Sequence, residues 1–383
     1  MKKWIGAAAV LFALAVAWAT APRIVEAQRN RVLRAPPYAV TPGARALFEG
    51  SVDLHADPLL WGRDLLEQGS RGQADVPRLL AAGAALQVFG VVTQSPSGQN
   101  IEHNSSDASD RITQLAVASR WPIATWRSRL QRALYQAERL RELAQRSAGQ
   151  LVPVLSRADL SAVIARRKAG ERTLGAMLGL EGSQALEGDL ANIDALWSAG
   201  FRMMSPAHFV DTEIGGSAHG AGKEGLTPLG RRWVRELEAR RIVIDLAHAS
   251  PRTSAEVLAL ATRPVVVSHT GVRGTCDNQR NLSDDQLRAL AKNGALVGIG
   301  YWDTAVCGSD AAAIARAMRH AADVMGVEHV ALGSDFDGAV TTPFDATGVP
   351  LLAEALRQQK FSDQDIAAIA GGNAIRFFLA ELP

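Results

Sequence analysis

Seven histidines and carboxylates stand at or just beyond the ends of short apolar runs, at widely separated places in the sequence: His55, Asp57, Glu181, His208, His248, His269 and Asp335. Imidazole nitrogens and carboxylate oxygens are ligands for Zn²⁺, and they also suit Mn²⁺ or Co²⁺. In the stretch DLHAD, the alternation of strand side chains puts His55 and Asp57 on one face, where they can bind one ion together. We therefore expect a metal site, provided that the fold brings the ends of these runs together.

The same residues offer a hydrolytic mechanism. Glu181 can bridge two ions with its two oxygens, and two ions lower the pKa of a water that they share. Asp335, in the stretch LGSDFDG, is placed to take the proton of that water and to pass it to a leaving amine. Asp337 in the same stretch is the alternative acid–base group, although it lies further from the end of the run.

Each of these residues also has an ordinary structural explanation when it is considered alone. A His-x-Asp at a strand end is more often a hydrogen-bonded pair than a metal site, Glu181 could begin a helix, and His208 could be a loop residue. Asp53 and Asp245 could orient the histidines or simply be buried caps. Because seven such residues follow successive runs, we favour the metal site. The other four histidines lack this placement, and we expect them in loops or on the surface: His103, His219, His320 and His329.

The apolar runs themselves predict strands. Nine runs have this character: 51–57, 85–92, 151–155, 174–181, 201–205, 242–247, 264–268, 296–301 and 329–334. Helical patterns lie between most of them: 126–148, 227–240, 283–293 and 310–325. Strands that alternate with helices and are almost continuously apolar favour a parallel sheet that is buried on both faces. The carboxyl ends of the strands of a (β/α)₈ barrel open on one face, which would gather the seven residues around one pocket.

An α/β TIM barrel has eight strands, so one of the nine runs must lie outside the barrel. The run 151–155 is the weakest, because Pro153 lacks the N–H that a central strand needs, and we place it in a loop insertion. Residues 93–125 are polar and turn-rich at their start, so we expect a second long loop there. Capping pairs are predicted at the starts of two helices: Ser283 with Gln286, and Ser362 with Asp365.

The N-terminus is different in kind. Lys2 and Lys3 precede an uncharged run, residues 4–21, that is typical of an export signal, either cleaved or retained as a membrane anchor. Its candidate cleavage sites are Ala17-Trp18-Ala19 and Val25-Glu26-Ala27. We take 1–27 as this signal or anchor, 28–49 as a connector and 50–383 as a single domain. Both fates of the signal export the domain, either to the periplasm or to a membrane-anchored position outside the cytoplasm.

The composition excludes several classes of protein. The chain has 383 residues and a net charge of +2 without a dense cluster of Lys and Arg, which argues against a nucleic-acid partner and for a small molecule. With only two cysteines, Cys276 and Cys307, it can hold neither a zinc knuckle nor a disulfide-rich scaffold. In an exported chain such a pair favours a disulfide over two free thiols, and that argues against cysteine catalysis.

Taken together, the motifs resemble those of the membrane dipeptidase family, also called renal dipeptidase, within the metal-dependent amidohydrolase superfamily. They follow the family's order and spacing over about residues 50–380: DLHAD, LGLEG, MMSPAH, IDLAHAS, VVSHTG, CDNQRN, LGSDFDG and GGNAIRFF. The resemblance implies two Zn²⁺ ions and hydrolysis of the amide bond of a dipeptide, with tolerance of a D-residue at the C-terminal position.

The resemblance also implies how the metals are held. His55 and Asp57 would bind one zinc ion, and His248 and His269 would bind the other. Glu181 would bridge the two ions.

Further residues receive roles in catalysis and in substrate binding from the same resemblance. His208 would bind the oxyanion of the tetrahedral intermediate, and Arg280 would hold the carboxylate of the substrate with its guanidinium fork. Asp335 would carry the proton. Cys276 and Cys307 match a disulfide known in animal members.

Two features depart from those animal members. They carry a signal for a GPI anchor, whereas this chain ends in FFLAELP without an apolar tail, so we expect any membrane attachment to come from the N-terminus. The region 93–135, which in the family helps to cover the site, has a different pattern here. The preferred dipeptide therefore stays open, together with the physiological metal and a possible homodimer.

Two other functions also stay open. A different amidohydrolase, such as a deaminase or a lactonase, would show His-x-His on its first strand, where this chain has His55-Ala56-Asp57. A metal-loaded binding protein without catalysis would need no acid–base residue, and Asp335 argues against it.

Overall fold

The computed structural model describes residue 18 and residues 20–383, so most of the predicted export signal lies outside the described residues. Residues 20–29 are helical. Among the described residues, no helix is both long and apolar enough to span a membrane.

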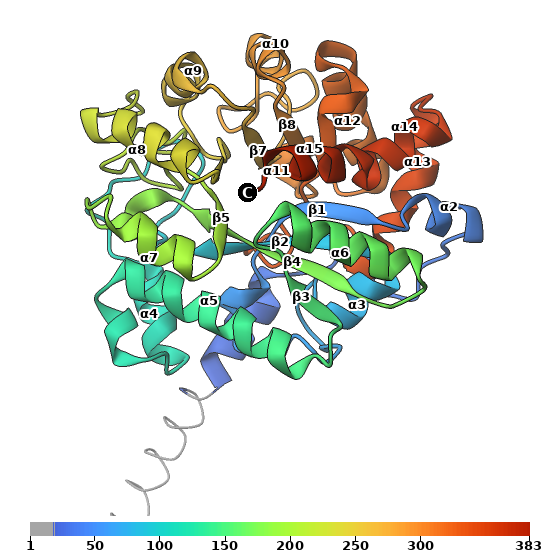
Figure 1. Cartoon of the computed structure of the whole chain (residues 1–383), viewed down its shortest axis with the longest axis horizontal. Helices are drawn as coiled ribbons and strands as arrows, with labels where there is room; N and C mark the ends of the chain where they lie inside the picture. The colour runs from blue at the N-terminus through green and yellow to red at the C-terminus, as the bar shows by residue number, and fades with distance from the viewer. Residues whose placement is uncertain (1–17, 19) are drawn as a thin grey trace, which may run out of the picture.

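Nine strands form one sheet in which the hydrogen-bonded neighbours are parallel (Figure 1). Their bounds are β1 Ser51–Ala56, β2 Ala84–Val92, β3 Leu151–Pro153, β4 Leu174–Glu181, β5 Phe201–Met204, β6 Val243–Ile244, β7 Val266–Thr270, β8 Leu296–Ile299 and β9 Val330–Leu332. All residues of β1, β2 and β4 are buried, as expected for strands that are covered on both faces. The strands coincide with the nine predicted runs, and the predicted parallel α/β sheet is confirmed.

The sheet curls until its two end strands meet. Its path runs β6-β5-β4-β2-β1-β9-β8-β7, and a parallel bridge between Asp245 and Val266 connects β6 to β7. Across the same junction, the N–H of Leu246 donates to the carbonyl of Val266 at 2.7 Å. This curled parallel sheet is consistent with a TIM-like barrel.

Strand β3 lies off this path. It pairs with the first residues of β4, from Leu174 to Ala176, while β5 pairs with β4 from Leu178 onward. Pro153 is the last residue of β3, where its missing N–H no longer interrupts a ladder. The weakest of the nine predicted strands therefore lies outside the eight-strand path, as expected, but it is a strand of the sheet, and its placement in a loop insertion is not confirmed.

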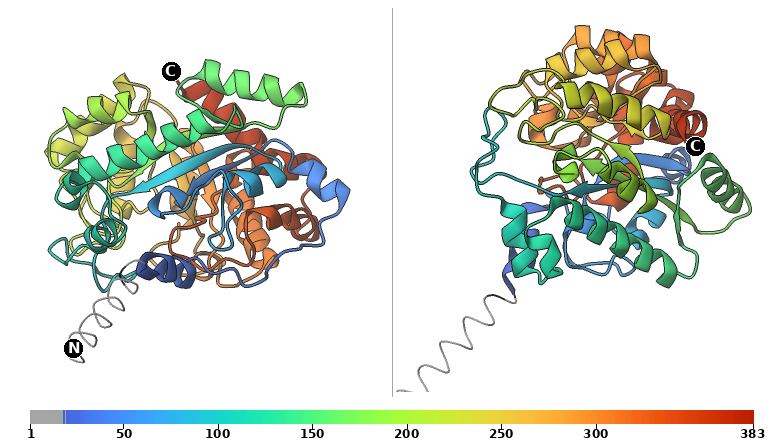
Figure 2. Two further views of the ribbon diagram at one scale, coloured as in Figure 1. Left: turned by 90° about the horizontal axis from the view of Figure 1, so that it is seen from below. Right: turned by 60° about the vertical axis from the view of Figure 1, so that its left-hand side comes forward.

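Helices cover the outside of the sheet (Figures 1 and 2). Their bounds are α2 Pro42–Leu47, α3 Val76–Ala81, α4 Arg111–Ala118, α5 Arg129–Arg146, α6 Arg157–Lys168, α7 Asn192–Ser198, α8 Pro228–Ala239, α9 Pro251–Leu260, α10 Asp284–Asn293, α11 Asp303–Val306, α12 Ala311–Met325, α13 Leu352–Gln358, α14 Asp363–Ala367 and α15 Asn373–Glu381. The four predicted helical patterns correspond to α5, α8, α10 and α12. Both predicted capping boxes are present, at Ser283 with Gln286 and at Ser362 with Asp365.

Part of the predicted long loop 93–125 is helical, so that prediction was wrong for α4. The side chain of Asp110 caps this helix by accepting from the N–H of Ile112 at 2.9 Å. Ile112 and Ala116 are four residues apart and belong to a small buried cluster with Trp121. Polar residues on both flanks of one short apolar stripe hid the helix in the sequence.

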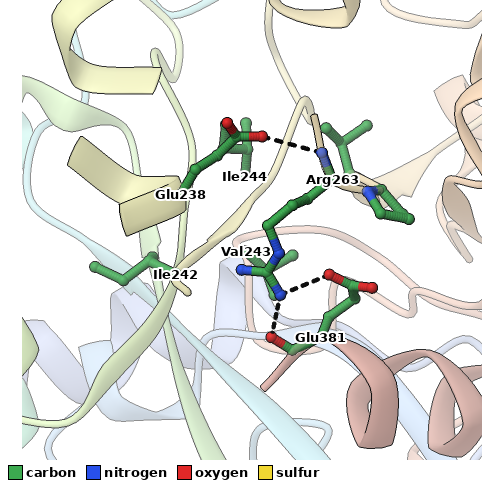
Figure 3. A pocket seen from close by; sticks show the side chains of 8 residues that line it. Glu238, Ile242, Val243, Ile244, Arg263 and Glu381 are labelled. Carbon is green, nitrogen blue, oxygen red and sulfur yellow. Dashed lines mark hydrogen bonds and ion pairs between the residues drawn. The ribbon is translucent and has the colours of Figure 1, made fainter. Parts of the chain in front are cut away.

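Figure 3 shows a small cavity between the starts of β6 and β7. Arg263 closes it through an ion pair with Glu381 at 2.6 Å, and the N–H of Arg263 donates to Glu238 at 3.1 Å. The cavity volume is about 10 Å³, roughly the room that one water molecule needs. These contacts join the segment before β7 to α8 and α15, and the cavity is too small for a substrate.

Candidate metal centre

The structure brings all seven predicted residues together at one end of the sheet. They lie at or beyond the carboxyl ends of six strands: His55 and Asp57 at β1, Glu181 at β4, His208 after β5, His248 after β6, His269 in β7 and Asp335 after β9. Each is at least nine-tenths buried. Parallel strands expose their carboxyl ends on one face, which is why residues so far apart in the sequence converge.

One oxygen of Glu181 lies at the middle of this cluster. Its Oε1 atom lies 3.1 Å from Nε2 of His248, 3.4 Å from that of His269, 3.5 Å from that of His208 and 3.6 Å from that of His55. Two ligand atoms that are each about 2.1 Å from one tetrahedral ion are about 3.4 Å apart. The separations around Glu181 are therefore those expected of atoms that share metal ions.

The other contacts complete two sides of the cluster. On one side, the Nε2 atoms of His248 and His269 are 2.8 Å apart. On the other side, Nε2 of His55 lies 3.3 Å from Oδ2 of Asp57 and 3.9 Å from Oδ1 of Asp335. Two pairs of ligands thus flank the central glutamate.

Hydrogen bonds show that Nδ1 carries a hydrogen in two of the imidazoles. The hydroxyl of Ser268 donates to Asp245 at 2.6 Å, so it must accept from Nδ1 of His269, which lies 3.0 Å away. Nδ1 of His208 lies 3.3 Å from the carbonyl of Gln94, which can only accept. In the neutral ring of His269, Nε2 therefore presents its lone pair to the cluster, and Nδ1 of His208 carries the hydrogen that it donates to Gln94. Gln94, just past β2, was not among the predicted site residues.

The cluster fits a metal by its donor atoms. Among the described residues, three buried atoms of His55 and Asp57 have no hydrogen-bond partner: Nδ1 and Nε2 of His55, and Oδ1 of Asp57. Buried polar atoms without partners are rare because they are costly. His55, Asp57 and Glu181 offer ligand atoms that all lie within 4.8 Å of one another, and so do Glu181, His208 and His248. A bound ion would satisfy the Nε2 atom and the carboxylate.

The neighbouring strand leaves room for these ligands. Gly90 of β2 faces Asp57 and His55, and a Cβ atom there would lie 2.2 Å from Oδ1 of Asp57 and 2.7 Å from Cε1 of His55. Such contacts are far inside van der Waals distance. Only glycine fits opposite this pair.

Two buried aspartates join the strands that carry the site. Asp53 accepts from the N–H of Ser334 at 2.8 Å and from its hydroxyl at 2.6 Å. Asp245 accepts in the same way from the N–H of Ser268 at 2.9 Å and from its hydroxyl at 2.6 Å. A site residue follows each serine, so these contacts favour an orienting role over simple capping.

The charges of the cluster are mutually dependent. Burial alone would raise the pKa of Glu181, but His208 and His55 hold it well below its usual range. Burial alone would lower the pKa of His55, but the neighbouring carboxylates raise it well above its usual value. Burial lowers the pKa of His248 and of His269 well below the usual value. Without metal, the carboxylate of Glu181 is therefore ionised and the ring of His55 is positively charged. The rings of His248 and His269 are neutral.

Asp335 belongs to the cluster, whereas Asp337 is engaged elsewhere. Burial raises the pKa of Asp335 well above its usual range, and the nearby carboxylates add to this effect. The carboxylate of Asp337 pairs with Arg63 and accepts from two backbone N–H groups, at residues 73 and 74, at 2.8 and 3.1 Å. Of the two candidate acid–base groups, only Asp335 faces the candidate metal ligands.

Arg280 lies beside the cluster on a separately braced loop. Its guanidinium donates to the carbonyl of His269 at 2.7 Å and to the hydroxyl of Thr270 at 3.2 Å, and among the described residues it pairs with no carboxylate. Burial lowers its pKa to about 10, so it stays charged at neutral pH. A disulfide between Cys276 and Cys307, with Cα atoms 5.1 Å apart, ties this loop to the end of α11. The predicted disulfide is confirmed, and it braces a buried cation that can receive an anion.

One histidine that was expected in a loop or on the surface lies in a turn and is buried beside the cluster. His219 is 1% exposed, its ring stacks on Phe209 at 4.5 Å, and it lies 5.1 Å from the ring of His248. Its Nδ1 atom lies 2.8 Å from the carbonyl of Ile101, and burial, reinforced by Arg280, lowers its pKa to about 3. The sequence did not indicate this burial, because the stretch GGSAHG has no apolar run. The other three histidines are exposed or partly exposed, as expected: His103, His320 and His329.

Comparisons with known proteins identify the family of this chain. A family model for membrane dipeptidase (peptidase family M19) matches residues 45–381. A Klebsiella pneumoniae protein described as the uncharacterized protein in the pqqA 5′ region is 28% identical over 253 residues, which cover 62% of this chain and 91% of that protein.

Two solved structures share the fold. One is a metallo peptidase from Rhodobacter sphaeroides liganded with a phosphinate mimic of the dipeptide L-Ala-D-Ala, with a TM-score of 0.69 and 22% identity over 87% of this chain and 99% of that chain. The other is the probable dipeptidase PvdM from Pseudomonas aeruginosa, with a TM-score of 0.71 and 17% identity over 88% of this chain and 97% of that chain.

The matched region spans every strand of the sheet and every residue of the cluster, from His55 to Asp335. The chain therefore belongs to the membrane dipeptidase family, peptidase family M19.

Proposed function

We propose that this chain is a dipeptidase that works with two Zn²⁺ ions and accepts a D-residue at the C-terminal position of its substrate. Membership of the family supports a metal-dependent dipeptidase. The observation that carries the proposal is the Oε1 atom of Glu181, which lies within 3.6 Å of four imidazole nitrogens, with the unpaired guanidinium of Arg280 beside them.

Two sets of ligands would hold the ions, with Glu181 shared between them. His55 and Asp57 would bind the first ion. His248 and His269, whose Nε2 atoms are 2.8 Å apart, would bind the second. Mn²⁺ or Co²⁺ suits the same donors. When bound, the ions supply Lewis acidity and a water whose pKa is lowered toward neutrality.

Arg280 would bind the free carboxylate of the dipeptide. A buried guanidinium without a carboxylate partner gains most from such a ligand, because it already lies outside bulk water. Its loop is braced by the disulfide, so the carboxylate is held at a set distance from the cluster. Longer peptides place their carboxylate elsewhere and should be poor substrates.

His208 would stabilise the negative charge that develops on the carbonyl oxygen of the scissile amide. Gln94 accepts from its Nδ1 atom, so the second proton of the ring would lie on Nε2, where it can be donated. Oε1 of Glu181 lies 3.5 Å from this Nε2 atom.

Asp335 would move the proton. Burial raises its pKa, which makes its carboxylate a stronger base than an exposed aspartate. It would accept the proton of the attacking water and return it to the departing amine, so one residue serves both steps.

Tolerance of a D-residue and the place of action are further parts of this proposal. The Rhodobacter sphaeroides structure holds a mimic of L-Ala-D-Ala, which supports the stereochemistry. The bridge from Asp245 to Val266 supports closure of the eight strands into a (β/α)₈ barrel. The disulfide supports an oxidising compartment, so we place the domain outside the cytoplasm, in the periplasm or held at the membrane.

The first experiment uses the full-length chain, purified in detergent without chelator. Bound metal per chain is measured together with hydrolysis of L-Ala-D-Ala, L-Ala-L-Ala and a tripeptide. We expect about two zinc ions per chain, and activity that is lost on chelation and restored by zinc. Hydrolysis of L-Ala-L-Ala only would refute the stereochemical proposal. Two bound zinc ions with no hydrolysis of any dipeptide would refute the proposed dipeptidase activity.

A substitution at Asp335 separates an enzyme from a metal-loaded binding protein. We expect Asp335→Asn to keep its metal and to lose kcat by about 10²- to 10⁴-fold, the usual contribution of a general acid–base group. Asp285→Asn is the control, because that side chain is 96% exposed. Wild-type kcat in Asp335→Asn would remove this residue from the mechanism.

A further inference from the structure

A glutamate of the N-terminal segment is buried in the body of the protein. Glu26 belongs to the helical residues 20–29, which Figure 2 shows in dark blue at the edge of the molecule. It is 1% exposed, and its two oxygens pair with Nε of Arg63 at 2.5 Å and Nε of Arg71 at 2.6 Å. A carboxylate that is buried between two arginines is part of a packed structure, because removing either side leaves an unpaired buried charge.

Arg63 connects this glutamate to Asp337. Its Nη2 atom pairs with the carboxylate of Asp337, and its Nη1 atom donates to the carbonyl of Ala74 at 2.8 Å. The side chains of Glu26, Arg63 and Asp337 therefore form a continuous buried chain of ion pairs. That chain ends two residues after Asp335.

The loop that carries Asp335, residues 333–342, depends on outside support. Asp335, Asp337 and Ala339 have φ angles of 60°, 64° and 62°, in the left-handed region that residues with a side chain seldom adopt. Such conformations persist where the surroundings hold them. The N-terminal segment reaches Asp337 through the ion pairs and Ala339 through Asn30, whose side-chain oxygen accepts from the N–H of Ala339 at 2.9 Å.

Backbone pairing extends this attachment. Val32 forms a parallel bridge with Thr342, the N–H of Thr342 donates to the carbonyl of Arg31 at 2.9 Å, and the N–H of Leu33 donates to the carbonyl of Thr342 at 3.0 Å. Gln73 donates to the carbonyl of Arg31 at 2.9 Å. The start of the predicted connector is thus bound to the loop of Asp335 over several residues.

We propose that Glu26 is a positioning residue for Asp335 and that the working enzyme keeps the chain from Glu26 onward. A cut after Ala27 would remove Glu26 and leave Arg63 and Arg71 without their shared carboxylate. A cut after Ala19, or a retained anchor, would keep the ion pairs. The kinetic half of this inference rests on the proposed function, whereas the half that concerns processing does not.

The kinetic test compares Glu26→Gln with the wild type, both full-length and zinc-loaded. We expect kcat for L-Ala-D-Ala to fall about tenfold, because displacing a reacting group costs rate. KM should stay within twofold, since Arg280 lies on a different loop, and bound zinc should not change. Glu26→Asp, which keeps the charge, should recover part of the lost rate.

A matched control removes a surface charge in the same way. Glu49 pairs with Arg167, but its side chain is 63% exposed, and Glu49→Gln should keep wild-type kcat. A wild-type kcat in Glu26→Gln would overturn the positioning role. So would a rise of KM in step with the fall of kcat, because the effect would then not be confined to Asp335.

A double-mutant cycle tests whether Glu26 acts through Asp337. If it does, the variant that combines Glu26→Gln with Asp337→Asn should have a kcat no lower than that of the less active single variant. Independent losses that multiply would overturn the route through Arg63. If the wild type hydrolyses no dipeptide, the proposed function fails, yet the same cycle can be read from the free energy of unfolding in urea.

The N-terminus of the exported protein tests the processing half without any variant. The intact mass of the chain, recovered from periplasm and membranes of a producing cell, should place its first residue at or before Glu26. A fully active chain that begins at residue 28 would overturn the proposal, even if the Glu26 variants fail to fold.

Discussion

The glycine opposite the first pair of ligands allows a sharp test of the metal centre. In Gly90→Ala the new Cβ atom would lie 2.2 Å from Oδ1 of Asp57 and 2.7 Å from Cε1 of His55. Contacts under 3.0 Å are essentially never seen for a real Cβ atom, so the carboxylate must retreat by about 0.8 Å. The strand cannot yield instead, because residues on both sides of Gly90 are paired with β4.

The size of the effect follows from that displacement. The ring of His55 has little room to move, because it lies against the ring of His269 with centroids 3.9 Å apart. A shift of about 1 Å in a catalytic group costs about 10²-fold in rate, which corresponds to about 2.7 kcal/mol. We therefore expect Gly90→Ala to lose about 10²-fold in kcat/KM for L-Ala-D-Ala, together with the metal that His55 and Asp57 would hold.

The assay measures zinc per chain, kcat/KM and the urea midpoint on one preparation. Gly62→Ala is the control, because among the described residues no atom outside its chain neighbours lies within 4 Å of the added Cβ atom. The control should match the wild type in all three quantities. If Gly90→Ala keeps full zinc content and a kcat/KM within twofold of the wild type, the assignment of His55 and Asp57 to a metal is refuted.

Three further predictions concern the surroundings of the cluster. Arg280→Lys should raise KM for dipeptides at least tenfold with a smaller change in kcat, because an ammonium cannot form the paired hydrogen bonds of a guanidinium. Steady-state kinetics test this, and an unchanged KM would contradict it. Cys276→Ser combined with Cys307→Ser should lower the free energy of unfolding by about 3 to 4 kcal/mol and raise KM, both relative to the oxidised, disulfide-bonded wild type; an unchanged free energy of unfolding would contradict this. His219 has a pKa of about 3 in the folded protein, so the unfolded chain takes up a proton there below about pH 6.5 and the folded chain does not. The free energy of unfolding therefore decreases as pH falls, by about 2 kcal/mol at pH 5. In urea titrations at pH 7.5 and pH 5, His219→Gln should lose less stability between the two pH values than the wild type, by about that amount. Equal losses in the variant and the wild type would contradict this.

The sequence predicted the fold well where burial acts on a whole strand. Runs such as ALQVFGVV in β2 are almost continuously apolar because helices and neighbouring strands cover both faces. Once the strands had been identified, their common direction indicated where the site lies, because the carboxyl ends of parallel strands lie on the same face. This is why residues as distant as His55 and Asp335 could be grouped before any geometry was known.

Prediction failed where a side chain depends on the path of a loop. His219 returns to the cluster through a glycine-rich turn, and nothing local in GGSAHG indicates that Phe209 will cover its ring. Asp335 and Asp337 could not be separated by strand alternation, because both have positive φ angles and point to different partners. The ion pair between Glu26 and Arg63 joins segments that no periodic pattern relates.

The wide spacing of the ligands has a consequence for how the protein acquires its metal. The cluster draws on six strands between His55 and Asp335, so no short fragment of the chain can assemble it. The cluster therefore exists only once the sheet has folded, so metal loading depends on folding. Histidine and carboxylate donors accept several divalent ions, and supply rather than affinity then decides which one is bound. We therefore expect the metal content of a preparation to follow the divalent ions that are supplied to the folded chain, with the scaffold unchanged.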